Sequence, residues 1–232
     1  MHLLDGFDLV CGGKPVPLPL SVQRLLAFLA FHDRPMQRVY VAGKLWLDTT
    51  EERAFANLRS TLWRAQRSAN GVVTAANGQL ALAATVNVDL REATLQARRF
   101  VDGSASAKEI SLAGLPLGRE LLPDWYDDWV LIERERHRQL ALHALEAVAD
   151  RLTALGRFGE AVEAAMAAIR IEPLRESAHR SVMRIHVAEG NASEALRHYE
   201  AYRRLLDETI GLEPSPRMAE LISGAYAALT KR

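Results

Sequence analysis

A short motif recurs at a constant spacing in the C-terminal half of this 232-residue chain. The segment GRFGEA at 156–161 returns as GNASEA at 190–195, which is an offset of 34 residues. This offset is the period of tetratricopeptide repeats. In each copy the glycine is suited to ending one helix, and Glu-Ala to beginning the next. We therefore predict stacked pairs of antiparallel helices here, with an ordinary helical bundle as the alternative.

Helical periodicity around the motif gives the expected helices. Two copies are fewer than the usual three, so other helices must complete the packing, and the segment 125–138 is one candidate. The helices are expected at 134–155 with 158–171, at 175–189 with 192–209, and at 216–230.

The first 84 residues predict a different module. Asn77-Gly78, between the expected strands 72–75 and 79–83, is the strongest two-residue signal for a hairpin. Three helices followed by a hairpin form a winged helix, in which the last two helices are the helix-turn-helix and the hairpin is the wing. Short strands are expected in residues 1–20, helices at 22–31 (capped by Ser21), 41–47, 52–69 and 89–101, and a loop at 32–37.

The predicted helix 52–69 has two contrasting faces. Phe55, Leu58, Leu62 and Ala65 form an apolar face, and no acidic residue lies between Arg53 and Arg67. Arg can donate paired hydrogen bonds to guanine or phosphate, and Asn can pair with adenine, so the polar face suits a DNA groove. A solvated surface helix is the alternative. The polar face comprises Arg53, Ser60, Arg64 and Arg67, with Asn57 and Trp63 at its edges.

Charge and composition favour a cytoplasmic protein of two modules. Residues 1–100 hold 12 Lys/Arg and 8 Asp/Glu, about +4, and residues 101–232 hold 17 and 21, about −4. This asymmetry fits an anion-binding module joined to a neutral or acidic one, although +4 alone does not establish nucleic-acid binding. An acid near the N-terminus disfavours a signal peptide, and the single cysteine, Cys11, suits a reducing compartment.

The sequence contains no assembled catalytic or metal-binding set. His179 and His186 share a helical face but lack a third ligand, and Gly12-Gly13 lacks the Lys-Ser/Thr of a phosphate loop. Asp124, Asp127 and Asp128 lie between a proline and two tryptophans, which indicates a structural corner. We therefore expect no enzyme, no cofactor, no metal and no membrane association.

The chain resembles bacterial regulators of the Streptomyces antibiotic regulatory protein type. The resemblance rests on residues 20–46 and 57–69, and more specifically on 121–136 and 154–214, where PLRE at 173–176 and GLEP at 211–214 fit the pattern. Such regulators join an OmpR-like winged helix to a tetratricopeptide-like activation domain. The resemblance implies a mainly α fold with a small β component. It places the winged helix at residues 1–100 and the activation domain at 101–232.

The resemblance also implies a function. Proteins of this type are sequence-specific transcription factors, usually activators, that bind direct repeats in double-stranded promoter DNA and contact RNA polymerase. Two molecules would then bind side by side, as a homodimer at least on DNA. Trp63 would lie at the groove edge, and Asn77 at the wing tip. The residues implied in DNA contact are Arg53, Asn57, Arg59, Ser60, Thr61, Trp63, Arg64, Arg67 and Asn77.

One departure keeps a second function open. Wings of this type often carry a basic residue, whereas residues 74–84 contain no Lys or Arg. A protein-interaction adaptor, whose winged helix serves as a scaffold or dimerisation module, is therefore the alternative.

Overall fold

The structure, a computed structural model, describes residues 1–106, 110 and 116–230. The chain divides into two compact units, Met1–Glu92 with Arg119–Arg136, and Ala93–Gly118 with His137–Arg232. Both are mainly helical with little strand, as predicted. The contacts thus divide the chain at three places, whereas the expected domains had a single boundary at residue 100.

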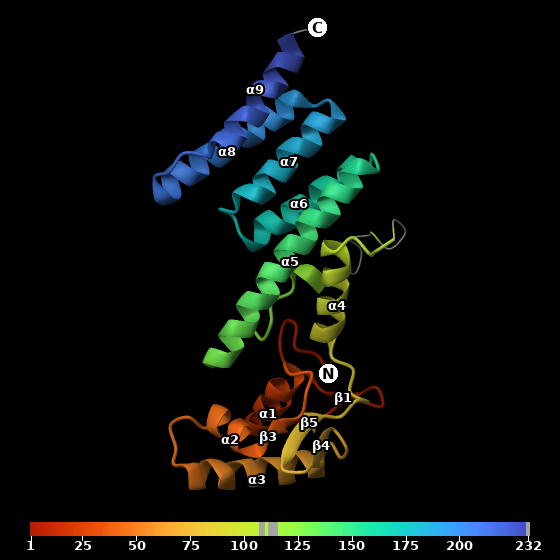
Figure 1. Ribbon diagram of the computed structural model, residues 1–232, viewed down its shortest axis with the longest axis vertical. Helices are drawn as coiled ribbons and strands as arrows, with labels where there is room; N and C mark the ends of the chain where they lie inside the picture. Colours follow the sequence, from red (N-terminus) through yellow and green to blue (C-terminus); the bar gives the residue numbers. More distant parts are fainter. Residues whose placement is uncertain (107–109, 111–115, 231–232) are drawn as a thin grey trace. The chain divides into compact units, whose positions relative to one another are not determined.

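The first unit is a winged helix (Figure 1). Its α1 lies in the core, where Leu25, Leu26 and Phe28 are at most 2% exposed. The wing strands belong to a three-stranded antiparallel sheet with the order β3-β5-β4. The elements are β1 (Val10–Cys11), β2 (Lys14–Pro15), α1 (Leu20–Ala30), β3 (Met36–Gln37), α2 (Arg38–Leu45), α3 (Glu51–Ser68), β4 (Val73–Ala76) and β5 (Gln79–Leu82).

Two local predictions are wrong in this unit. Pro19 precedes the first helical residue and no side chain caps α1, so Ser21 lies within the first turn instead of capping it. The expected loop 32–37 ends in β3, because the buried Met36 pairs with Leu80 of β5. Strand formation there depends on a partner 44 residues away (80 minus 36), which local pattern does not reveal.

The wing turn has the predicted form. Asn77 and Gly78 have φ of 50° and 73°, as a type I′ turn requires. The Gly78 carbonyl also accepts a 3.0 Å hydrogen bond from the backbone N–H of Arg38. The hairpin tip is therefore tied to the first residue of α2.

Residues 119–136 belong to the first unit and hold its N-terminal segment in place. Leu121 forms an antiparallel bridge with Leu4, and the Arg134 guanidinium donates to the Leu121 and Trp125 carbonyls at 2.8 Å. Asp127 accepts a hydrogen bond from Arg24. The aspartates 124, 127 and 128 were expected to form a structural corner, and Asp127 has such a role.

The second unit contains the helical repeats (Figure 1). Gly156 and Gly190 end the helices before α6 and α8 with φ of 71° and 90°, as their recurrence predicts. Helix α5 begins at Asp128, six residues before the expected start at 134, with the fully buried Val130 in its first turn. Two helices begin in the first unit and continue into the second, α4 (Asp89–Val101) and α5 (Asp128–Ala154). The others are α6 (Phe158–Ile171), α7 (Glu176–Glu189), α8 (Ala192–Ile210) and α9 (Pro216–Thr230), with the 3₁₀ turn η1 (Pro116–Gly118).

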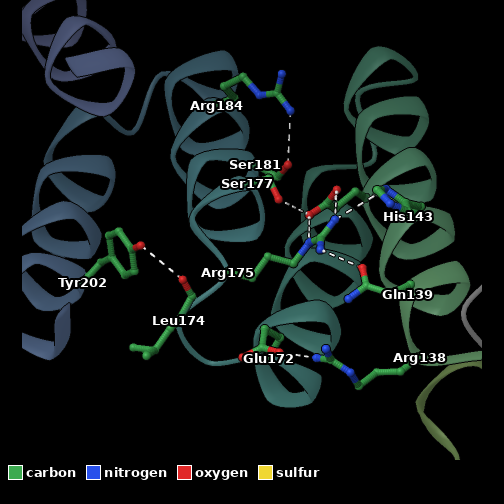
Figure 2. Close-up of polar contacts among 11 residues, drawn as sticks. Arg138, Gln139, His143, Glu172, Leu174, Arg175, Ser177, Ser181, Arg184 and Tyr202 are labelled. Carbon is green, nitrogen blue, oxygen red and sulfur yellow. Dashed lines mark hydrogen bonds and ion pairs between the residues drawn. The ribbon is translucent and has the colours of Figure 1, made fainter. Parts of the chain in front are cut away.

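Polar contacts join α5 to the start of α7 (Figure 2). The Glu146 carboxylate accepts hydrogen bonds from Arg175 Nε at 2.7 Å and from Ser177 Oγ at 2.5 Å. Burial raises the pKa of Glu146, but these two hydrogen bonds outweigh it and hold the pKa below its ordinary value. Arg138 pairs with Glu172 in the same region. The repeat pattern did not predict these ion pairs.

A histidine pair, of which His179 is buried and His198 half-buried, joins α7 to α8. His179 Nδ1 lies 3.0 Å from His198 Nε2, and His179 Nε2 lies 2.8 Å from the Pro173 carbonyl. The His179 ring also stacks on Tyr202 at 4.0 Å between centroids. His179 is therefore a core residue, in agreement with its interpretation as a structural histidine.

Candidate nucleic-acid interface

Helix α3 is positioned by one buried stripe. Ala54, Leu58, Thr61 and Ala65 are each at most 3% exposed, and their spacing of four, three and four residues places them on one face. Phe55 and Leu62, which the sequence also placed on the apolar face, are half-buried beside it.

Thr61 lies on the wrong side for DNA contact. Its side chain is only 2% exposed, whereas a base or phosphate contact needs an accessible polar atom. The resemblance placed Thr61 in the DNA-contact set by motif position. The structure instead places it in the core stripe, midway between Leu58 and Ala65, so it supports the helix and does not face outward.

The other predicted contact residues of α3 share the solvent-facing side. The helix begins after Thr50, whose hydroxyl accepts from the Arg53 N–H at 3.4 Å, and its only acidic residues are in the first turn. The negative charge of these acidic residues interacts favourably with the positive end of the helix dipole. The exposed residues of the predicted set are Arg53, Asn57, Arg59, Ser60, Trp63, Arg64 and Arg67.

The guanidinium groups of this face have no acidic partner among the described residues. In the part of the chain that the structure describes, no carboxylate lies within ion-pair distance of the four arginines of α3. Arg67 instead lies over the Trp63 ring, with its Cζ 4.9 Å from the ring centroid, and Trp63 is 58% exposed. The face is thus cationic and open to an anionic ligand.

The wing presents polar backbone but no cation. Asn77 is exposed at its tip, as the hairpin prediction requires. A groove between α3 and β4 is lined by Leu62, Gln66 and Val73, and also by Arg38 from the start of α2. Sequence reasoning missed Arg38, because its proximity to the wing depends on the pairing of β3 with β5. Arg38 is therefore a half-buried basic residue beside the wing.

The described residues contain neither a metal site nor a membrane-spanning helix. No three His, Cys, Asp or Glu side chains among them are arranged to hold a metal ion. None of the helices in the described ranges has the length and apolar character needed to cross a bilayer.

The fold and this surface define a protein of two modules, a winged helix with a cationic helix face and a helical repeat unit. Residues 116–224 match the family model of the bacterial transcriptional activator domain. The chain is 28% identical over 227 residues to the regulatory protein AfsR of Streptomyces griseus, and 29% identical over 231 residues to AfsR of Streptomyces coelicolor. These matches agree with the resemblance of the sequence to bacterial regulators of the Streptomyces antibiotic regulatory protein type.

These matches cover nearly all of this chain but only a small part of each relative. They cover 93% and 94% of this chain but only 23% and 22% of the relatives, so the chain spans less than a quarter of their length. A solved structure of Mycobacterium tuberculosis EmbR in complex with a low-affinity phosphopeptide has a TM-score of 0.68 and 21% identity. That match covers 98% of this chain and 64% of EmbR, and it supports the fold.

Proposed function

We propose that the chain is a DNA-binding transcriptional activator, with α3 as its recognition helix. The observation that supports this most directly is the cationic, solvent-facing side of α3, which has no acidic partner among the described residues. Its location in the third helix of a winged helix matches the element that enters the major groove in helix-turn-helix proteins. The match of residues 116–224 to the bacterial transcriptional activator domain agrees with this role.

The exposed residues of α3 can divide into two roles. Asn57, Ser60 and Arg64 lie in the middle of the helix and can reach base edges, which gives sequence choice. Arg53 and Arg67 lie toward the two ends and can contact phosphates, which gives affinity that falls with salt. Asn77, at the wing tip, contributes at most one uncharged contact. The proposed interface therefore excludes Thr61 from the predicted set.

Replacement of Arg64 by alanine is expected to weaken specific binding by about 1–3 kcal/mol, because a bidentate contact to a base is lost. Genomic fragments would first be selected on the purified chain, and affinities for a selected fragment would then be measured by gel shift. Arg204→Ala is the matched control, since it removes the same charge from an exposed site on α8. Equal affinity of the Arg64 variant and the parent would refute the assigned face.

The selection also separates the two candidate functions. Retention of defined sequences supports a DNA-binding regulator. Absence of retention even at low salt supports the adaptor, since the phosphate term of DNA binding is strongest there.

We further propose that the second unit contacts RNA polymerase, and that two copies bind adjacent direct repeats. The helical repeats are a surface suited to protein partners. With purified RNA polymerase and a selected promoter fragment, addition of the chain is expected to increase the amount of transcript. A decrease would identify a repressor, and no change on a fragment that the chain occupies would argue against any contact with the polymerase.

A further inference from the structure

Trp63 is the one large aromatic residue on the outward face of α3, and its position is not explained by packing. Its side chain is 58% exposed, whereas Leu58 and Ala65 of the same helix are almost fully buried. The Arg67 guanidinium lies over this ring, with its Cζ 4.9 Å from the ring centroid. The two residues are four apart, which is the spacing at which helical side chains meet.

The direction of helical side chains agrees with Arg67 as the partner. Long side chains on a helix point back toward its N-terminus, so a residue lies over the one four positions before it. Arg67 therefore reaches back to the Trp63 ring. The same rule places the Trp63 ring near Arg59, so the observed contact, and not spacing alone, identifies Arg67 as the partner. Among the described residues, Arg59 makes no cation–π contact with the indole.

A stacked guanidinium keeps its hydrogen-bonding capacity. The cation–π contact uses the flat face of the group, while the N–H donors point outward in its plane. An ion pair with a carboxylate would have consumed these donors. Trp63 can thus restrict the motion of a long, flexible side chain without competing with the ligand that the side chain binds.

The location of the pair points to a phosphate ligand. Arg67 is in the last turn of α3, whereas helix-turn-helix proteins contact base edges mainly from the N-terminal part of the recognition helix. A planar guanidinium matches the oxygen pair of a phosphate. Positioning such a group in advance lowers the entropic cost of the contact.

We propose that Trp63 is a positioning residue for DNA binding, which orients Arg67 toward a backbone phosphate. This inference rests on the proposed function, because it assumes that α3 binds DNA. It goes beyond that function in two ways. Trp63 acts by positioning Arg67, and Arg67 makes a phosphate contact that does not depend on the DNA sequence.

The test is a double-mutant cycle on the full chain with a random-sequence duplex, which reports the phosphate contacts without an operator. Arg67→Ala is expected to reduce the slope of log affinity against log salt by about one. Trp63→Ala is expected to weaken binding about two- to fivefold, the size of an exposed cation–π contact. In the Arg67→Ala background the Trp63 change is expected to have no further effect.

Arg59 provides the matched control. Arg59 is also four residues from Trp63 but makes no cation–π contact with it among the described residues, so the effects of Trp63→Ala and Arg59→Ala are expected to be additive. Because Trp63 is mostly exposed, its replacement is expected to leave the circular dichroism spectrum and the melting temperature unchanged. Trp63→Phe, which keeps an aromatic face, is expected to retain part of the affinity.

Two results overturn the inference, and they differ from failure of the proposed function. If Trp63→Ala reduces the DNA affinity by the same factor in the parent and in the Arg67→Ala variant, the two residues act independently. If Arg67→Ala weakens binding but Trp63→Ala does not, Arg67 needs no positioning. If instead the parent, Arg64→Ala and Arg67→Ala show equal affinities or no binding, α3 is not the DNA-binding element and both proposals fall.

Discussion

Replacement of Glu146 by alanine is expected to lower the free energy of unfolding by about 3 kcal/mol. Glu146 and Arg175 are ion-paired at 2.7 Å with side chains only 16% and 17% exposed. Removal of the carboxylate leaves a mostly buried guanidinium without its counter-charge, and also leaves the Ser177 hydroxyl without its acceptor. Urea denaturation at neutral pH would measure the loss.

Two further variants make this prediction specific. Glu163→Ala removes the same group from an exposed site on α6 and is expected to change stability by less than about 0.5 kcal/mol. The double variant Glu146→Leu with Arg175→Met replaces both charges by apolar groups, so it is expected to recover most of the loss. A similar loss in the Glu146 and Glu163 variants would show that the ion pair contributes nothing particular.

Acidification is expected to destabilise the chain by roughly 2–3 kcal/mol between about pH 6.5 and pH 4. Burial, with smaller effects of the charges of His179 and His186, lowers the pKa of His198 to about 4. Burial also lowers the pKa of His179, against the opposing effects of the Pro173 carbonyl and Glu176. The unfolded chain therefore takes up protons at a higher pH than the folded chain, and stability falls as the pH falls through this window.

His198→Gln tests the origin of this pH dependence. Glutamine can still donate a hydrogen bond to His179 but does not titrate. The variant is expected to lose less stability than the parent between pH 6.5 and pH 4, measured by urea denaturation at several pH values. Glu146 contributes only at the acid end of this window and below it, because its pKa is held below the ordinary value of a glutamate. An unchanged slope in the variant would assign the effect to other groups.

The elements with local signals were predictable from the sequence. The wing turn follows from Asn77-Gly78, because few other dipeptides accept two consecutive positive φ angles. The repeat follows from Gly156 and Gly190, which end helices in left-handed conformations. The helix 89–101 was predicted with its observed bounds, since its apolar periodicity is regular.

The remaining features depend on residues distant in sequence. Strand β3 exists because Met36 pairs with Leu80, and the contact of Glu146 with Arg175 joins residues 29 positions apart. Thr61 shows the limit for the candidate site. A small polar residue such as threonine can lie either in a core stripe or on a polar face. The orientation of α3 therefore determines that Thr61 points into the core.

The described arginines differ in whether they already form an ion pair with a carboxylate. Arg175, Arg184 and Arg157 of the second unit are paired with carboxylates, so binding an external anion would require breaking an internal ion pair. The arginines of α3 would give up only water and small ions. Binding of a polyanion at α3 is therefore expected to be driven by released counterions, without the cost of breaking an internal ion pair.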